Sequence, residues 1–121
     1  MRKRAGENIT FLGWREDAQS LFASADVCAV PSLWNEPFGT VGAEALSHGV
    51  GVVTFDVGGL SDWLIQGETG IFARERTAEA LAEALDKMAD KAFLAKTSLN
   101  ALNIVEKLFD PDNFMRNLLE W

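Results

Sequence analysis

The sequence has little of what several classes of protein require. It contains a single cysteine, Cys28, so no disulfide can form within the chain, and we expect a protein of the reducing cytoplasm. Basic residues are also scarce, 11 against 18 acidic residues, and the resulting net charge of −7 argues against nucleic acid or an anionic membrane surface as a partner. No apolar run approaches the roughly 20 residues that a membrane-spanning helix needs. The basic start, residues 1–8, leads into no apolar core of signal-peptide length.

What remains is the composition of a soluble globular domain. Apolar residues make up 48% of the chain and charged residues 24%, and 121 residues suffice for one domain with one core. Cys28 lies inside the apolar run VCAV, where a buried small hydrophobic residue is expected rather than a catalytic thiol.

Along the chain, β-rich runs alternate with segments of helical spacing. We expect strands at residues 9–14, 26–32 and 50–59, with a weaker one within 67–73. Helices are expected at residues 15–25, 38–49, 61–66, 77–90 and 91–107, with a last one announced by Asp110-Pro111. Ser61 and Thr77 are the expected N-caps of their helices, and Gly49 is the expected stop of the helix before it. Residues 26–32 and 50–59 are almost entirely apolar, as strands covered on both faces are.

This order of elements predicts the fold class. Strand-helix-strand units of this length form right-handed crossovers between parallel strands. We therefore expect an α/β fold with a partial doubly wound, Rossmann-like parallel sheet of about three to four strands and helices on both faces. Since a complete doubly wound sheet usually has more strands, residues 1–121 are expected to be part of one.

The stretch PSLWNEPFGTVGAEAL, residues 31–46, is the strongest candidate for a binding site. It follows a predicted strand, and in open parallel sheets ligands bind beyond the carboxyl ends of the strands. The next helix is expected to begin near Gly39 and Thr40, where unpaired backbone N–H groups and the helix dipole favour a phosphate. Pro37 stiffens the approach to the helix, and Gly39 lets a ligand come close to the backbone.

Two glutamates flank this anion site, and they suit hydroxyl groups rather than phosphates. Thr40 and Glu44 are four residues apart, on one helix face and about 6 Å apart along the axis. A ligand with its phosphate at Thr40 would extend a diol such as a ribose towards Glu44, while Glu36 would meet its other end. An ionised carboxylate accepts hydrogen bonds at both oxygens. A ligand with hydroxyls at both ends and phosphate in the middle is a nucleotide sugar.

At this point the sequence resembles a known family. EPFGTVGAE (residues 36–44) resembles the E-x7-E motif of retaining glycosyltransferases with the GT-B fold, especially glycosyltransferase family 4. Four further segments, in the family's order and spacing, resemble its donor-binding domain: ITFLGW (9–14), LFASADVCAVPS (21–32), GVGVVTFDVGGLSDWLIQGETGIF (49–72) and FDPDNFMRNLLEW (109–121). The resemblance covers nearly the whole chain and identifies residues 1–121 as the second half of a C-terminal, group 1 donor-binding domain, truncated at its N-terminus.

The resemblance implies roles for individual residues. Glu36 would contact the donor sugar near the reacting centre and is the candidate catalytic residue. Glu44 would bind the ribose diol. The backbone amides of Phe38, Gly39, Thr40 and Val41 would meet the sugar and the diphosphate. The anomeric configuration would be retained, with no metal and no cofactor besides the nucleotide-sugar substrate, and the leaving phosphate would assist removal of the acceptor proton.

The family also carries an acceptor-binding domain and a paired Arg and Lys, and no counterpart of that pair is found here. We therefore expect this chain to associate with a missing N-terminal glycosyltransferase region, or with itself through an exposed edge strand at residues 9–14. The alternative is a non-catalytic or split module of this fold that binds a partner or a nucleotide sugar without turnover. A sugar-nucleotide epimerase or a phosphorylase is a further alternative, although no histidine or lysine stands where their chemistry needs one.

Three other side chains near the motif have expected places. Phe38 is expected to plug the core beneath the loop and to offer a ligand only its backbone. Trp34 is expected to be an exposed loop aromatic, with stacking on a base or an acceptor as the alternative. His48, the only histidine, is expected at a helix C-terminus, where the dipole favours it.

Overall fold

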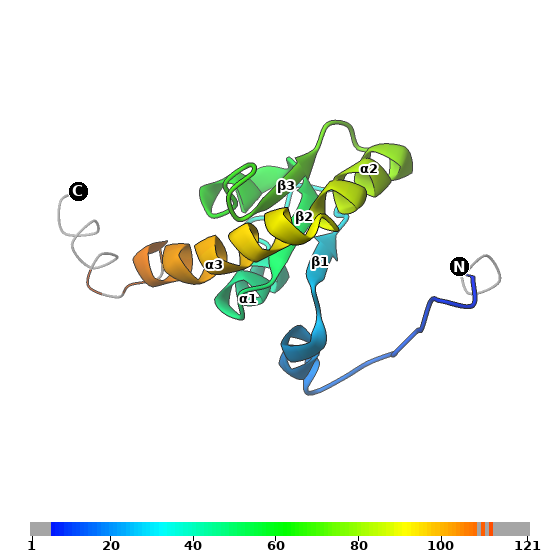
Figure 1. Ribbon diagram of the computed structural model, residues 1–121, viewed down its shortest axis with the longest axis horizontal. Helices are drawn as coiled ribbons and strands as arrows, with labels where there is room; N and C mark the ends of the chain where they lie inside the picture. The colour runs from blue at the N-terminus through cyan, green and yellow to red at the C-terminus, as the bar shows by residue number, and fades with distance from the viewer. Residues whose placement is uncertain (1–5, 109, 111, 113–121) are drawn as a thin grey trace.

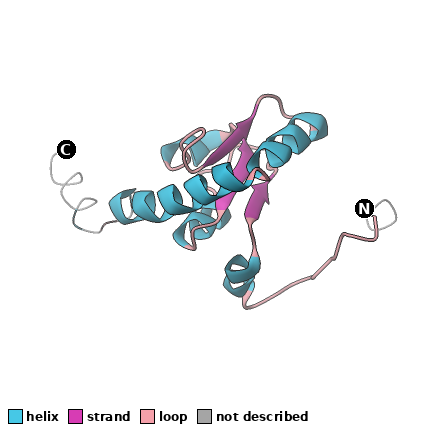
Figure 2. Cartoon of the chain, in the orientation of Figure 1, coloured by secondary structure: helices cyan, strands magenta, loops and turns pink. Residues whose placement is uncertain are grey.

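The computed structural model describes residues 6–108 together with Asp110 and Asp112. In these residues the chain forms a 3-10 helix η2 (Ala18–Ser24), strand β1 (Val27–Val30), helix α1 (Thr40–Ser47), strand β2 (Gly51–Phe55), 3-10 helix η3 (Gly58–Asp62), strand β3 (Gly70–Ala73), helix α2 (Ala78–Met88) and helix α3 (Lys91–Leu108). Within the described part the three strands form one parallel sheet in the order β1-β2-β3 (Figures 1 and 2). The predicted α/β class and parallel sheet are confirmed.

Strand β2 is the centre of the structure. It pairs with β1 from Gly51 to Thr54 and with β3 from Val52 to Phe55, and all five of its residues are buried. Helix α1 packs on β1 and β2, α2 packs on β2 and β3, and α3 passes across β2 to reach α1 (Figure 1). The most deeply buried large side chains come from several of these elements: Leu46, Val52, Val53, Leu60, Trp63 and Met88.

Local sequence signals fix the helix ends. Helix α1 ends at the His48 C-cap, and Gly49 follows with a left-handed φ of 72°, as the predicted stop requires. The hydroxyl of Thr77 accepts a hydrogen bond from the N–H of Ala80 at 3.2 Å, which confirms the predicted cap of α2. Helix α3 coincides with the helix predicted from residue 91.

The two edges of the sheet differ. On the outer side of β3, the N–H of Phe72 donates to Gln66 Oε1 at 2.6 Å, and the carbonyl of Gly70 accepts from the N–H of Gly67 at 2.8 Å. These bonds occupy backbone groups that another strand would need. On the outer side of β1, no strand among residues 6–108 pairs with it.

The predicted strand at residues 9–14 is wrong. This segment forms no strand, and Ile9, Leu12 and Trp14 are exposed, Trp14 to 92%. Figure 1 shows the segment running away from the sheet. A β-rich run becomes a strand only when a neighbouring strand satisfies its backbone groups, and no described strand pairs with this segment. The helix predicted at residues 15–25 is shortened to the 3-10 helix η2.

Three smaller predictions also need correction or fall outside the description. Strand β1 is not covered on both faces, since it is an edge strand whose Ala29 is exposed. Ser61 caps no helix, because η3 begins earlier, with Val57 as its N-cap. Of the last predicted helix, the structure describes only that the Asp110 carboxylate accepts from the N–H of Asp112 at 3.0 Å, and residues 113–121 lie outside the described part.

The position of Gly39, the N-cap of α1, requires a residue without a side chain. Its φ of 71° lies in the left-handed region, and a Cβ atom there would overlap the side chain of Leu60. Since that Cβ would point at Leu60 and Trp63, the glycine serves the packing of the helix start on the core, which is a different reason from the predicted approach of a ligand.

We predict that Gly39→Ala lowers the free energy of unfolding by about 2–5 kcal/mol, as the sum of left-handed strain and overpacking. Gly67 is the matched control, because its φ of 75° is similar while nothing lies within 4 Å of an added Cβ. Gly67→Ala should therefore cost only about 1–2 kcal/mol. Urea unfolding of the two variants measures the difference, and equal losses would contradict the packing of Leu60 against Gly39.

Candidate functional site

The candidate site is the loop of residues 31–39 that leaves the carboxyl end of β1 and enters α1. Gly39 offers no side chain to cap the helix. The backbone N–H groups of Gly39, Thr40 and Val41 have no acceptor within the described part of the chain, since the first helical bonds to the Gly39 carbonyl come from Gly42 and Ala43. Three neighbouring N–H groups at the positive end of a helix dipole attract an anion.

Glu36 is fixed in the loop at two points. Its carboxylate Oε1 accepts a hydrogen bond of 2.7 Å from the hydroxyl of Ser32, which is only 7% exposed. Its backbone carbonyl accepts from the N–H of Gly59 in η3 at 2.8 Å. The side chain of Glu36 is half-buried. One carboxylate oxygen is therefore used to hold the rotamer, and the other has no hydrogen-bond donor among the described residues.

Glu44 lies one turn beyond Thr40 on α1, and the two side chains line one open cavity of about 270 Å³. The cavity wall consists of residues from the loop, α1 and α3: Phe38, Thr40, Ala43, Glu44, Ser47 and Val105. The structure thus brings together three of the predicted site residues, Phe38, Thr40 and Glu44. Glu36, Gly39 and Val41 do not line this cavity. They belong to the loop and the helix start beside it.

The side chain of Phe38 is not the predicted core plug. It is 38% exposed and lines the cavity. The space beneath the loop is taken by Leu60 and Trp63, which are 0% and 1% exposed and come from η3 and its C-cap. Trp34 is 67% exposed, so the expectation of an exposed loop aromatic is confirmed.

Sequence reasoning missed several residues that shape this region. Ser32 lies in the candidate stretch of residues 31–46, but no pattern in the sequence indicates that it is the hydrogen-bond partner of Glu36. Val105 enters from a helix about sixty positions further along the chain, and only the fold brings it to the cavity. Trp63 donates its indole N–H to the carbonyl of Phe38 at 2.5 Å. The sequence feature that could have indicated this role is a tryptophan in a short apolar segment, because the N–H of a buried indole usually has a hydrogen-bond acceptor.

A cation also lies at the carboxyl edge of the sheet. The guanidinium of Arg76, which follows β3, donates to the carbonyl of Asp56, which follows β2, at 3.2 Å. Arg76 makes no ion pair in the part of the chain that the structure describes, whereas neighbouring Arg74 pairs with Glu83. Arg76 is therefore a positive charge at the edge of the sheet where ligands of open α/β folds bind.

The described residues contain no group of three or more His, Cys, Asp or Glu side chains that could hold a metal ion. No helix in the described residues has the length and apolar character that crossing a membrane requires. Burial raises the pKa of the Cys28 thiol in β1, so this residue carries little of the thiolate that a nucleophile needs at neutral pH.

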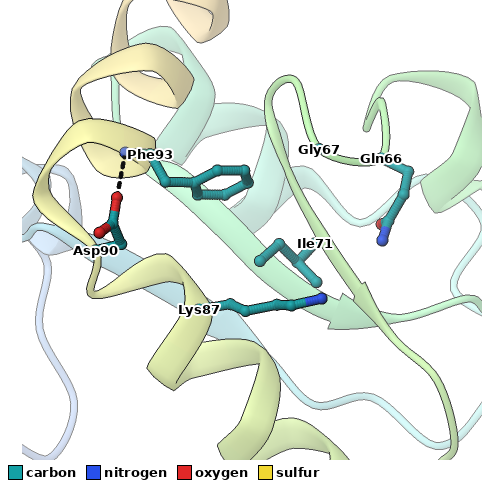
Figure 3. Close-up of a pocket in the computed structure, with 6 residues that line it drawn as sticks. All are labelled: Gln66, Gly67, Ile71, Lys87, Asp90 and Phe93. Carbon is teal, nitrogen blue, oxygen red and sulfur yellow. Dashed lines mark hydrogen bonds between the residues drawn. The ribbon is translucent and has the colours of Figure 1, made fainter.

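A separate cavity of about 280 Å³ lies where β3 meets the end of α2 and the start of α3 (Figure 3). Its wall contains none of the predicted site residues. Asp90 is occupied there as the cap of α3, with Oδ1 accepting from the N–H of Phe93 at 2.9 Å, and Figure 3 shows Lys87 extending alongside Ile71. The polar groups of this cavity do not converge on one point, so it is not the candidate site.

Two relatives illustrate the similarity in sequence. The chain is 37% identical over 84 residues to the D-inositol 3-phosphate glycosyltransferase of Corynebacterium aurimucosum, covering 68% of this chain and 20% of that protein. It is 32% identical over 111 residues to an uncharacterized glycosyltransferase of Methanocaldococcus jannaschii, covering 89% of this chain and 28% of that protein. The chain thus spans about a fifth to a quarter of the length of these relatives.

Solved structures with the same fold include HepE of Anabaena and a sucrose-phosphate synthase. HepE of Anabaena, in a crystal structure with UDP and glucose, matches with a TM-score of 0.80 and 28% identity over 94% of this chain and 32% of that one. Sucrose-phosphate synthase of Thermosynechococcus elongatus matches with a TM-score of 0.67 and 32% identity over 83% of this chain and 27% of that one.

The sequence also matches the family described as "Glycosyl transferases group 1" over residues 1–91, three quarters of the chain. Together with the parallel α/β sheet and the loop between β1 and α1, this match shows that the chain belongs to the group 1 glycosyl transferases.

Proposed function

We propose that residues 1–121 are the donor-binding part of a C-terminal glycosyltransferase domain and bind a nucleotide-diphosphate sugar for retaining glycosyl transfer in the cytoplasm. The observation that carries this proposal is the start of α1. Three backbone N–H groups with no acceptor among the described residues, on Gly39, Thr40 and Val41, are flanked in the sequence by two carboxylates, Glu36 in the loop and Glu44 on the helix.

The comparisons support the class of ligand. The structure of HepE has been solved with UDP and with UDP-glucose, and this chain matches it at 27–28% identity. The groups of such a ligand complement those of the candidate site: its phosphates suit the N–H groups, and the hydroxyls of its two rings suit the flanking carboxylates. A UDP-sugar is therefore the first donor to test, ahead of GDP- and ADP-sugars.

In this proposal each residue acts by positioning or by stabilising charge. The N–H groups of Gly39, Thr40 and Val41, and the backbone of Phe38, meet the sugar and the diphosphate, whose negative charge grows as the glycosidic bond breaks. Glu44 accepts hydrogen bonds from the ribose hydroxyls, and Glu36 contacts the donor sugar near the anomeric carbon. No metal and no cofactor take part, and the leaving phosphate assists removal of the acceptor proton.

Replacing Glu44 tests the ligand assignment. We predict that Glu44→Ala raises the Kd for UDP-glucose about 10- to 100-fold, because hydrogen bonds to a charged group contribute about 1.5–3 kcal/mol each. Ligand-observed NMR with UDP-, GDP- and ADP-sugars measures the change. Glu79→Ala is the matched control, since Glu79 is an exposed helical glutamate of α2 outside the cavity, and its affinity should equal that of wild type.

The other outcomes of this experiment separate the alternatives. Equal binding by wild type and Glu44→Ala would remove Glu44 from the site. Binding by neither protein would favour the split or non-catalytic module. Incubation of the wild-type chain with a labelled donor and either water or simple acceptors then tests whether it transfers the sugar alone or needs the remainder of the enzyme.

The open edge of the sheet leads to a prediction about association. We propose that the chain pairs with a further glycosyltransferase region, or with a second copy of itself, through the outer edge of β1, with which no other described strand pairs. The isolated chain should therefore dimerise or be of low stability. A chain that sediments as a monomer at all concentrations and melts cooperatively above about 60 °C would contradict this, since typical domains melt near or below that temperature.

A further inference from the structure

Trp63 connects the core to the start of α1. It follows η3, is 1% exposed, and is one of the largest fully buried side chains in the described part of the chain. Its six-membered ring lies directly against Gly42 in the first turn of α1, where an added Cβ would overlap the ring. Its indole N–H donates to the carbonyl of Phe38 at 2.5 Å. The ring is thus held on the helix, and its one polar atom is held on the loop.

This bond fixes the direction of the next N–H group. The peptide between Phe38 and Gly39 is trans, so its carbonyl and its N–H point in opposite directions. Because the carbonyl points inwards at the buried indole, the N–H of Gly39 points away from Trp63. This N–H is one of the three in the site that lack a protein acceptor.

Because residue 39 is a glycine, the orientation of the Phe38–Gly39 peptide depends on a bond such as that from Trp63. Rotation of the Phe38–Gly39 peptide changes ψ of Phe38 and φ of Gly39, and glycine tolerates both signs of φ. A rotated peptide would present a carbonyl instead of an N–H to an anion. The indole of Trp63 donates to this carbonyl, and this bond stabilises the orientation with the N–H outwards.

A second bond from the same segment steadies the loop on the other side of Pro37. The N–H of Gly59 donates to the carbonyl of Glu36 at 2.8 Å, and an added Cβ on Gly58 or Gly59 would overlap the backbone of Glu36 or Pro37. Pro37 has a restricted φ and no N–H of its own. The bond from Gly59 and the ring of Pro37 therefore hold the loop up to Pro37, and the bond from Trp63 holds the Phe38–Gly39 peptide that follows.

The geometry points to Trp63 as a positioning residue: its indole N–H holds the Phe38–Gly39 peptide so that the Gly39 N–H faces the phosphate of the donor. This inference rests on the proposed function, because the phosphate belongs to the proposed nucleotide sugar. It adds a residue that touches no ligand and that acts on the phosphate-binding end of the site alone. The ribose contact of Glu44 is independent of it.

Trp63→Phe tests the role, because phenylalanine keeps an aromatic side chain in the core and removes the N–H. We expect the Kd for UDP to rise about tenfold or more, the loss that a misplaced charge-assisted hydrogen bond produces. The Kd for uridine, which has no phosphate, should be unchanged. Glu44→Gln should show a different pattern, with both uridine and UDP bound more weakly. Ligand-observed NMR measures the six constants for wild type and the two variants.

Two controls separate positioning from a loss of stability. Ala84→Gly weakens α2, remote from the loop, and should leave the Kd for UDP unchanged. In the ligand-free protein, the indole N–H of Trp63 should be protected from hydrogen exchange, unlike those of the exposed Trp14 and Trp34, and this protected signal should be absent from Trp63→Phe. If the phenylalanine variant does not fold, benzothienylalanine at position 63 keeps the ring shape and replaces the N–H by sulfur.

The outcomes are distinct for the two proposals. UDP affinity equal to wild type in a folded Trp63→Phe overturns the positioning role and leaves the proposed function intact. Equal losses in Trp63→Phe and Ala84→Gly, or equal losses for UDP and uridine, also overturn it. Failure of the wild type to bind UDP overturns the proposed function and the positioning role together, and the protected indole would then report a structural contact only.

Discussion

The site depends on one constraint, the attachment of the loop after β1 to the segment after β2. Two donors in that segment, the N–H of Gly59 and the indole of Trp63, hold the carbonyls of Glu36 and Phe38. Both donors are positioned by β2, the fully buried central strand that ends three residues before η3 begins. The start of α1 thus takes its orientation from the core of the sheet. Without these bonds the loop would be a flexible connection between a short edge strand and an eight-residue helix.

This attachment explains why small residues concentrate here. Gly39, Gly42, Gly58 and Gly59 all lie where a Cβ would overlap Leu60, Trp63 or the backbone of the loop. The close approach lets one indole ring contact the helix and reach the loop carbonyl at the same time. A Gly-Gly pair at the end of a strand is consistent with a simple turn, but in this chain it also lets two backbone segments come within hydrogen-bonding distance.

The elements that sequence reasoning predicted well are those whose signals are local. Thr77 caps α2, Gly49 ends α1, and the apolar run of β2 is buried throughout. The errors arise where the outcome depends on distant neighbours. Residues 9–14 have the composition of a strand, but no described strand pairs with them. Phe38 is a typical core residue, but Leu60 and Trp63 already fill the core beneath the loop. The candidate loop could be located from its motif, whereas its attachment through Ser32, Gly59 and Trp63 required the fold.

A net charge of −7 and two carboxylates oppose the binding of a diphosphate, but the groups act over different distances. Exposed charges are screened within about 8 Å at physiological ionic strength, so most of the acidic surface has little effect at the loop. The N–H groups at the start of α1 act at hydrogen-bonding distance, and Arg76 adds one cation at the same edge of the sheet. Glu36 and Glu44 do repel a bare anion at this range. Under the proposed function, hydrogen bonds to the two carboxylates offset this repulsion only when the ligand carries hydroxyls on both sides of its phosphates. The same carboxylates would thus make the site selective for a nucleotide sugar over inorganic phosphate.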